Sequence, residues 1–219
     1  MNQHTDVILV RHGVTDWNQA RRFQGQIDIP LNESGREQAR LTGRRFAESR
    51  AAQPVHRVLA SDLSRARDTG AAIAHACGLD LQIEPLWRER HYGMFEGQTH
   101  DDLQQTAAQA YQRWRAREPD FALPGGGESL DVFNARVHRA LAALVQEYAR
   151  QTVVVATHGG VLDCVYRIAA GLDLQAPRHF DLKNASFNHI RWDGQAFSII
   201  NWGDVSHLPE ALDDIEAKG

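Results

Sequence analysis

Two short runs of branched aliphatic residues constrain the fold of this 219-residue chain more than any other feature. Residues 7–10 (Val-Ile-Leu-Val) and 153–155 (Val-Val-Val) are typical of strands buried on both faces of a sheet. Each run leads into a histidine followed by a glycine, at His12 in one case and at His158 in the other. Because ligands bind beyond the carboxyl ends of strands in open α/β sheets, we expect both histidines to meet at one crevice.

Segments with a helical spacing of apolar residues lie between the predicted strands. Asn32 can cap a helix over about residues 33–50, and a second helix reaches Cys77, where Gly78 ends it. A long helix starts near Ser129, and its apolar stripe consists of Leu130, Phe133, Val137, Leu141, Leu144 and Tyr148. Further helices are predicted over about 98–117 and 161–170, and further strands over 57–60, 81–83, 187–192 and 197–201. This alternation predicts an α/β fold with a mostly parallel sheet covered on both faces.

Length and composition are those of a folded globular protein. We expect a single domain over residues 1–219, with a small lid insertion at about 98–127. The net charge of −4 gives no reason to expect nucleic acid or a membrane surface as a partner. The two cysteines make no disulfide framework, residues 1–6 lack an apolar signal core, and no apolar stretch reaches the roughly 18 residues of a membrane span. We therefore expect a cytoplasmic protein, and its oligomeric state stays open.

The sequence around His12 favours covalent catalysis over metal binding. No His-x-x-x-His pair or cysteine cluster accompanies this histidine, so no metal is expected. A neutral imidazole can attack phosphorus, and a neighbouring cation such as Arg11 disfavours the protonated ring. A strand-end histidine with a satisfied hydrogen bond is the alternative, and for the Arg-His-Gly sequence alone the two interpretations weigh equally.

Three more residues could complete a phosphate site. Arg65 follows a predicted strand, and its planar guanidinium can hold two phosphate oxygens; a surface salt bridge is the alternative. His158 can donate a further bond to the phosphoryl oxygens. Glu89 can protonate the leaving oxygen and then activate water, although its neighbours Arg88 and Arg90 favour the carboxylate form. A solvated carboxylate in a charged run is the alternative for Glu89.

Several separated motifs occur in one order along the chain. They are Arg11-His12-Gly13 with Asn18 and Phe23-Gln24-Gly25, residues 31–35 (Leu-Asn-Glu-Ser-Gly), residues 61–66 (Ser-Asp-Leu-Ser-Arg-Ala), Glu89 before Tyr92-Gly93, and Thr157-His158-Gly159. In this combination the chain resembles the histidine phosphatase superfamily, in its phosphoglycerate-mutase-like branch, from residue 7 to about residue 207. The resemblance implies a three-layer α/β/α fold, a phosphohistidine intermediate, and neither a metal nor another cofactor.

The resemblance also implies catalytic roles, residue by residue. His12 matches the nucleophile of the family, and Glu89 matches its general acid and base. Arg11, Arg65 and His158 match the pocket that holds the phosphoryl group. These five residues form the predicted catalytic set.

A second set consists of candidates for substrate binding. They are Asn18, Phe23, Gln24, Gly25, Tyr92 and Asn184. The resemblance implies an outer phosphate-binding loop that contains Asn18, Gln24 and Gly25. Phe23 and Tyr92 are candidates for contact with the leaving group. For Asn184, a place facing the pocket and a place in a turn stay equally open.

The short segment between residues 98 and 127 bears on the reaction that we expect. Cofactor-dependent phosphoglycerate mutases, which residues 89–93 resemble, have a longer insertion with an adjacent arginine pair for the substrate carboxylate. This chain offers Arg113, Arg115 and Arg117 instead, and in a helix the first and last would share a face. We therefore expect a phosphatase that hydrolyses a small phosphorylated metabolite. A mutase and a weakly catalytic phospho-ligand binder are the alternatives, and the natural substrate stays open.

Four other residues are predicted to be structural. Glu128 and Ser129 start the long helix, and Cys164 and Trp114 pack against apolar neighbours. His207 receives no catalytic role.

Overall fold

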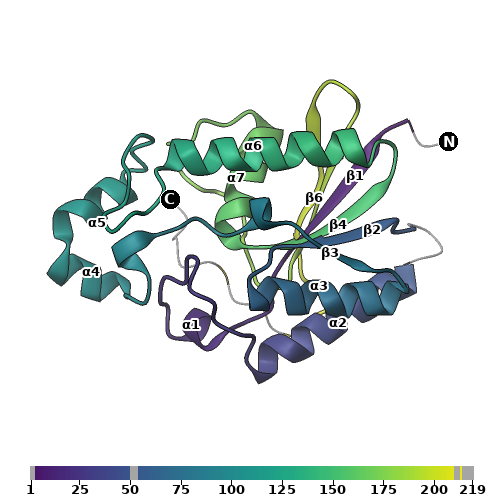
Figure 1. The fold of residues 1–219 in the computed structure, drawn as a ribbon, viewed down its shortest axis with the longest axis horizontal. Helices are drawn as coiled ribbons and strands as arrows, with labels where there is room; N and C mark the ends of the chain where they lie inside the picture. Colours follow the sequence, from purple (N-terminus) through teal and green to yellow (C-terminus); the bar gives the residue numbers. More distant parts are fainter. Residues whose placement is uncertain (1–2, 50–53, 210–212, 214–219) are drawn as a thin grey trace.

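The computed structural model describes residues 3–49, 54–209 and 213, and within them six strands form one central sheet (Figure 1). The strands are β1 (Thr5–Arg11), β2 (Arg57–Ala60), β3 (Leu81–Ile83), β4 (Thr152–Thr157), β5 (Phe187–Trp192) and β6 (Phe197–Asp204). Their order is β3-β2-β4-β1-β5-β6. The first four run parallel to one another, whereas β5 is antiparallel to both β1 and β6. The predicted mostly parallel sheet is confirmed.

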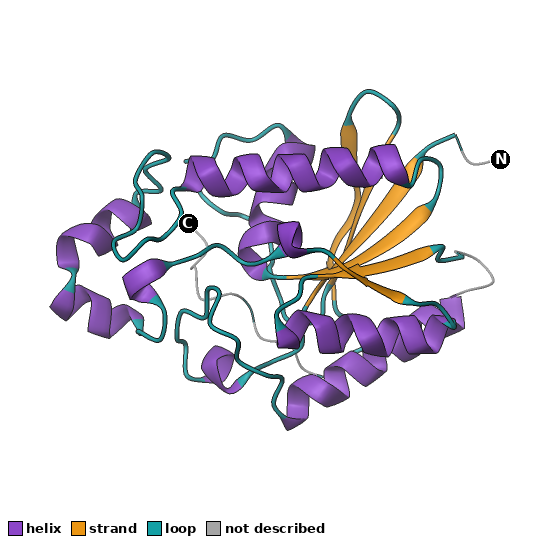
Figure 2. Cartoon of the chain, in the orientation of Figure 1, coloured by secondary structure: helices purple, strands orange, loops and turns teal. Residues whose placement is uncertain are grey.

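Helices cover both faces of this sheet, so the fold has three layers (Figure 2). The long helices are α2 (Glu33–Ser49), α3 (Ser64–Cys77), α6 (Leu130–Glu147) and α7 (Gly159–Ala170). Successive residues of β1 alternate between the two faces: Val7 and Leu9 lie in the core with α6 and α7, and Ile8 and Val10 in the core with α2 and α3. This double burial explains why the strand reads as a continuous apolar run.

The predicted helix ends agree with the structure. Asn32 Oδ1 accepts a hydrogen bond from Gly35 N (2.9 Å) at the start of α2, and the predicted last residue, Arg50, lies outside the described residues. Gly78 ends α3 in the left-handed conformation, with φ 65°. Ser129 caps α6 by accepting from Val132 N.

The single helix predicted over 98–117 is wrong. Two helices, α4 (His100–Thr106) and α5 (Ala108–Arg115), meet at Ala107, whose φ of −146° is not helical. The change in direction lets both helices turn apolar side chains toward a common cluster: Phe23, Tyr92, Phe95, Leu103, Tyr111, Trp114 and Leu123. The helices lie at one end of the molecule, beyond the sheet (Figure 1). The burial of Trp114 confirms the predicted packing role.

Smaller differences concern the ends of elements and short helices. A one-turn helix, α1 (Asp16–Gln19), follows the first strand and was not predicted; Thr15 and Asn18 form its capping box. Two 3-10 turns, η1 (Pro85–Trp87) and η2 (Gly93–Phe95), flank Glu89. The helix predicted from about 161 begins at Gly159, and β6 runs three residues past 201. Cys164 is fully buried in the core, as predicted.

Candidate active site

The ends of β1 and β4 bring the two histidines together. Arg11 pairs with Thr157 in the last register of these parallel strands, and His12 N donates to Thr157 O (2.9 Å). The rings of His12 and His158 follow, with their centroids 5.3 Å apart. His12 lines a cavity of about 250 Å³, together with residues of the loop after α1. The two histidines meet as predicted, and a cavity lies at this point, but only His12 is among its lining residues.

The tautomer of His12 follows from one contact. Its Nδ1 lies 2.7 Å from the carbonyl oxygen of Gly13, which can only accept, so Nδ1 carries the proton. In the neutral ring, Nε2 then holds the lone pair. Burial lowers the pKa of His12 well below its ordinary value, and the charges of Arg65 and Arg11 lower it further. His12 is thus a neutral imidazole with a basic Nε2, which is the form that a nucleophile needs.

Arg65 is completely buried at the start of α3. Its Nη1 donates to Ile27 O (3.0 Å) and its Nη2 donates to Gly25 O (2.7 Å), so the loop around residues 25–27 is tied to this guanidinium. Burial lowers its pKa to about 10, and the charge of Glu89 opposes that shift. Because these carbonyls are neutral, the surface salt bridge considered as the alternative does not describe Arg65.

His158, the residue that follows β4, is buried without a hydrogen-bond partner for its ring in the described part of the chain. The side chain is completely buried, and neither ring nitrogen has a hydrogen-bond partner among the residues that the structure describes. Burial, and then the charge of Arg65, lower its pKa well below the ordinary value. Buried polar groups are normally hydrogen-bonded, so this ring is suited to meet a ligand. We call the lining residues Arg11, His12 and Arg65, together with His158 beside the His12 ring, the floor of the cavity.

Glu89 lies against the floor and is not a solvated carboxylate. It is 8% exposed and lines the cavity. Its Oε1 accepts from Arg90 N (2.8 Å), and its Oε2 accepts from Gly160 N (3.0 Å) at the start of α7. The side chains of the flanking arginines hydrogen-bond elsewhere: Arg88 pairs with Asp62 (2.7 Å), and the Arg90 side chain donates to the backbone carbonyl of residue 128.

An arginine that the sequence analysis missed holds the segment that carries Glu89. Arg136 of α6 donates from Nη1 to the carbonyl of Arg88 (2.7 Å) and from Nη2 to that of Glu89 (3.0 Å). Glu128 accepts from Nε (3.0 Å) and Nη2 (2.8 Å) of the same side chain. Glu128 therefore does not start α6, as predicted, but fixes Arg136. The sequence offered one signal for Arg136: it precedes Val137 and so lies next to the apolar stripe of the helix.

The wall of the cavity comes from the loop after α1. Asn18, Phe23, Gln24 and Gly25 line it together with Tyr92, so five predicted substrate-binding residues are brought together. We call the lining residues of 17–25 the rim. Gly25 has φ 54°, and a Cβ there would lie 2.0 Å from Glu96 Oε1, an atom that accepts from both Gln26 N and Tyr92 N (3.0 Å each). The close approach of this carboxylate requires the glycine.

Asn184 lies behind the floor and does not line the cavity. Its Nδ2 donates to His12 O (2.9 Å), and its buried Oδ1 has no partner among the described residues. The backbone of Ala185 adds a bond from its N to Arg11 O (3.0 Å). Asn184 therefore steadies the backbone of the histidine rather than facing the pocket.

The three arginines of the lid segment do not reach the cavity. Arg117 lies beyond the end of α5, so the expectation that it shares a helix face with Arg113 is wrong. Arg117 pairs with Asp163 (2.6 Å), and Arg113 pairs with Glu118 (2.5 Å). Arg115 is exposed and is not among the lining residues. Arg21 and Arg22 line the rim instead, and sequence reasoning missed both of them.

A metal-binding group and a membrane-spanning helix are both absent from the part of the chain that the structure describes. No three His, Cys, Asp or Glu side chains of the described part are grouped in a way that could hold a metal ion. Among the described helices, none has both the length and the apolar character to cross a membrane. His207 lies away from the floor, with its Nε2 3.2 Å from Thr42 Oγ1.

The fold and the site define an α/β enzyme with a buried histidine pair between cations. Residues 7–205 match the model of the histidine phosphatase superfamily (branch 1), and the chain belongs to that superfamily. A metal-independent phosphoserine phosphatase of Arabidopsis thaliana is 40% identical over 206 residues, which cover 93% of this chain and 83% of the relative. Phosphoglycerate mutase-like protein 4 of the same plant is 36% identical over 209 residues, which cover 94% and 88%.

Solved structures extend the comparison to the fold. Bacillus stearothermophilus YhfR matches with a TM-score of 0.82 and 31% identity, over 93% of this chain and 98% of that chain. The protein thus is a member of the histidine phosphatase superfamily with the phosphoglycerate-mutase-like fold.

Proposed function

We propose that the protein hydrolyses small phosphate monoesters in two steps, with His12 carrying the phosphoryl group between them. The observation that carries this proposal is the neutral ring of His12, whose basic Nε2 lies beside Arg11 and Arg65. In the first step Nε2 bonds to phosphorus, while the bond from phosphorus to the alcohol oxygen breaks. In the second step water attacks the phosphohistidine, phosphate leaves, and Nε2 regains its lone pair.

Glu89 moves the proton that each step requires. It protonates the alcohol oxygen as the first bond breaks, and as a carboxylate it takes a proton from the attacking water. Its place in the same cavity as His12 supports this role, as do the two backbone donors that orient its oxygens.

The remaining residues bind the substrate. Arg11, Arg65 and His158 hold the phosphoryl oxygens, a role supported by the two partnerless ring nitrogens of His158. Phe23 and Tyr92 contact the leaving group. Asn18, Gln24 and Gly25 form the wall around the phosphoryl group. No metal takes part, because a neutral histidine flanked by cations supplies both the nucleophile and the charge stabilisation.

Hydrolysis rather than mutase chemistry is the preferred reaction. A mutase retains its substrate and returns the phosphoryl group to a second hydroxyl, which requires a second set of substrate contacts. None of the three lid arginines lines the cavity, so an arginine clamp from the lid is missing in this chain. The similarity to a mutase-like relative keeps the mutase as the second candidate. The complete set of nucleophile, cations and proton donor argues against a mere phospho-ligand binder.

Incubation with 3-phosphoglycerate distinguishes the two reactions. We expect free phosphate as the product, or no reaction, with 2,3-bisphosphoglycerate giving no stimulation. Rapid formation of 2-phosphoglycerate that depends on this bisphosphate would establish the mutase instead. Turnover of p-nitrophenyl phosphate in the presence of EDTA tests metal independence, and radiolabelled substrate quenched in alkali tests for phosphohistidine.

The proposal extends to the domain organisation, the partner and the cellular location of the protein. We infer a single domain over residues 1–219, in which residues 98–127 form a lid beside the cavity. The partner is a small phosphorylated metabolite, in keeping with a cavity of about 250 Å³. Two buried free cysteines, Cys77 and Cys164, are in keeping with a reducing, cytoplasmic location.

A further inference from the structure

Two arginines at the rim differ in what holds their side chains. Both Arg21 and Arg22 are exposed and line the cavity. Arg22 Nη1 donates to Gly97 O (2.6 Å) and lies 3.8 Å from an oxygen of Asp102. The guanidinium of Arg21 has no hydrogen bond or ion pair with any residue that the structure describes. Arg21 is therefore a cation that faces the cavity and keeps its donors available.

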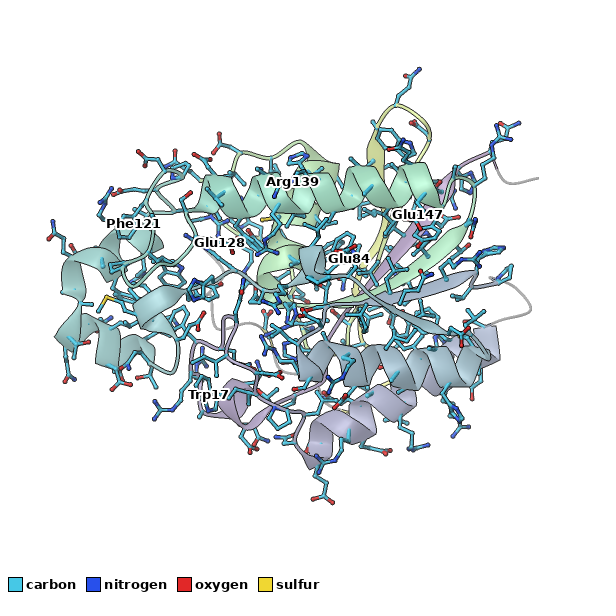
Figure 3. The ribbon with its side chains drawn as sticks, viewed as in Figure 1. Trp17, Glu84, Phe121, Glu128, Arg139 and Glu147 are labelled. Carbon is cyan, nitrogen blue, oxygen red and sulfur yellow. The ribbon has the colours of Figure 1, made fainter. Side chains whose placement is uncertain are left out.

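The backbone of Arg21 adds an independent observation. Its φ is 52°, in the left-handed region that residues with long side chains seldom adopt. Bonds on either side hold the turn, because Arg21 N donates to Asn18 O (3.2 Å) and Arg22 N donates to Trp17 O (2.9 Å). Figure 3 labels Trp17, which marks this loop beside the cavity. Strain of this kind is concentrated at ligand sites, where the surrounding structure maintains it.

The charges along the cavity indicate what Arg21 could bind. The floor already provides Arg11 and Arg65 for the phosphoryl group, and a phosphoryl dianion calls for such a pair. Asp213, also at the cavity, accepts from Leu182 N (2.9 Å) and lies 3.4 Å from Arg178. The Arg21 fork can bind the two oxygens of a carboxylate, and its single charge matches the single charge of that group, whereas a second phosphate dianion would need a further cation.

We propose that Arg21 binds a carboxylate on the leaving alcohol, so that the preferred substrates are phosphate monoesters of small hydroxy acids. This proposal rests on the phosphatase function proposed above and names its substrate class. The carboxylate contact then comes from the loop after α1 and not from the lid, where Arg113 and Arg117 are engaged with acidic partners. Arg21 determines specificity and takes no part in the chemical steps.

Two pairs of substrates isolate the carboxylate. Phosphoserine and phosphoethanolamine share the ammonium group, and 3-phosphoglycerate and glycerol 1-phosphate share the hydroxyl; within each pair only the first carries a carboxylate. The informative variant is Arg21→Asn, because asparagine tolerates the left-handed backbone and removes the charge. Arg115→Asn is the matched control, since Arg115 is an exposed lid arginine that does not line the cavity.

We expect the wild-type protein to prefer the carboxylated member of at least one pair. Arg21→Asn should lower kcat/KM for that member by about 10- to 100-fold, mainly through KM, as expected for a lost charge-assisted hydrogen bond. The uncarboxylated member and p-nitrophenyl phosphate should change by less than about threefold, and Arg21→Lys should retain part of the preference.

Three results would overturn the proposal. They are equal activity of the wild type on both members of each pair, equal losses on both members in Arg21→Asn, and loss of the preference in Arg115→Asn. Turnover of p-nitrophenyl phosphate in each variant reports separately on the phosphatase function. A protein that hydrolyses that ester without any carboxylate preference retains the function proposed above and refutes the role of Arg21.

Discussion

The floor and the rim of the cavity are held in different ways. The floor consists of side chains at the ends of β1 and β4 and at the start of α3, and they are exposed by 3% or less. The rim comes from α1 and the loop after it, and its anchors are Phe23 in the lid cluster, Glu96 against Gly25 and the bond from Arg65 to Gly25 O. The floor thus belongs to the sheet and α3, whereas the rim also depends on a separate apolar cluster. We expect chemistry to reside in the floor and selectivity in the rim.

The largest effect should come from the floor itself. His12→Ala removes the lone pair that we expect to attack phosphorus, so turnover of every phosphate ester should fall by at least about 10³-fold. Initial rates with p-nitrophenyl phosphate and with an alkyl phosphate measure this loss, and the circular dichroism spectrum checks the fold. His138→Ala, at an exposed position of α6, is the matched control. A folded His12 variant with nearly wild-type rates would remove the distinction between floor and rim.

Replacing Glu89 tests whether this residue, which lies against the floor, transfers the proton to the leaving group. General acid catalysis is typically worth about 10²- to 10⁴-fold, and an alkyl alcohol needs the proton more than p-nitrophenolate does. Glu89→Gln should therefore lose activity in that range with an alkyl phosphate and clearly less with p-nitrophenyl phosphate. Labelled phosphohistidine should accumulate with the activated ester if Glu89 also activates water. Equal losses with both esters and no trapped intermediate would assign Glu89 a structural role.

Arg136 holds the backbone of Glu89, so its replacement should cause a smaller loss of activity that again depends on the leaving group. Arg136→Lys keeps the charge but cannot reproduce the fork that binds three backbone carbonyls and Glu128. A displaced proton donor should lower kcat for an alkyl phosphate by about 10- to 100-fold, with a smaller change for p-nitrophenyl phosphate. Arg139→Lys is the control on the same helix; Arg139 is exposed and labelled, with Glu128, in Figure 3. If both esters lose equally, Arg136 serves the fold and not Glu89.

The contrast between the floor and the rim also explains which parts of the site could be predicted from the sequence. The floor was predictable because β-branched strands end at His12 and His158, and parallel strands carry their ends to one edge of the sheet. The α/β class and the long helices followed from apolar periodicity and caps. These signals are local in the sequence, so no knowledge of tertiary contacts was needed.

The resemblance named Asn18, Phe23, Gln24 and Gly25 of the rim, but the contacts that hold the rim in place were not predictable, since they join distant segments. The break at Ala107 has no glycine or proline to mark it; it allows α5 to place Trp114 against Phe23, with ring centroids 5.0 Å apart. The left-handed backbone of Arg21 likewise carries no local signal. Arg136 reaches Glu89 from 47 residues away, and periodicity alone gave it no partner.

The smallest expected effect lies outside both regions, at His207. This ring packs against Phe187, and burial lowers its pKa to about 4, with Asp204 opposing and Arg45 adding to the shift. In the unfolded chain a histidine titrates near 6.5, so between about pH 4 and pH 6.5 the unfolded state binds more protons at this site. The free energy of unfolding should therefore rise with pH across this window.

Urea denaturation of wild type and His207→Gln at several pH values measures the contribution of this site. The variant should show a flatter dependence of unfolding free energy on pH, by up to about one proton, while kcat on p-nitrophenyl phosphate stays within about twofold at pH 7. His138→Gln, at an exposed site, should leave the wild-type dependence unchanged. A His207 variant with the full wild-type slope would assign the acid sensitivity of folding to the floor, where burial also lowers the pKa values of His12 and His158.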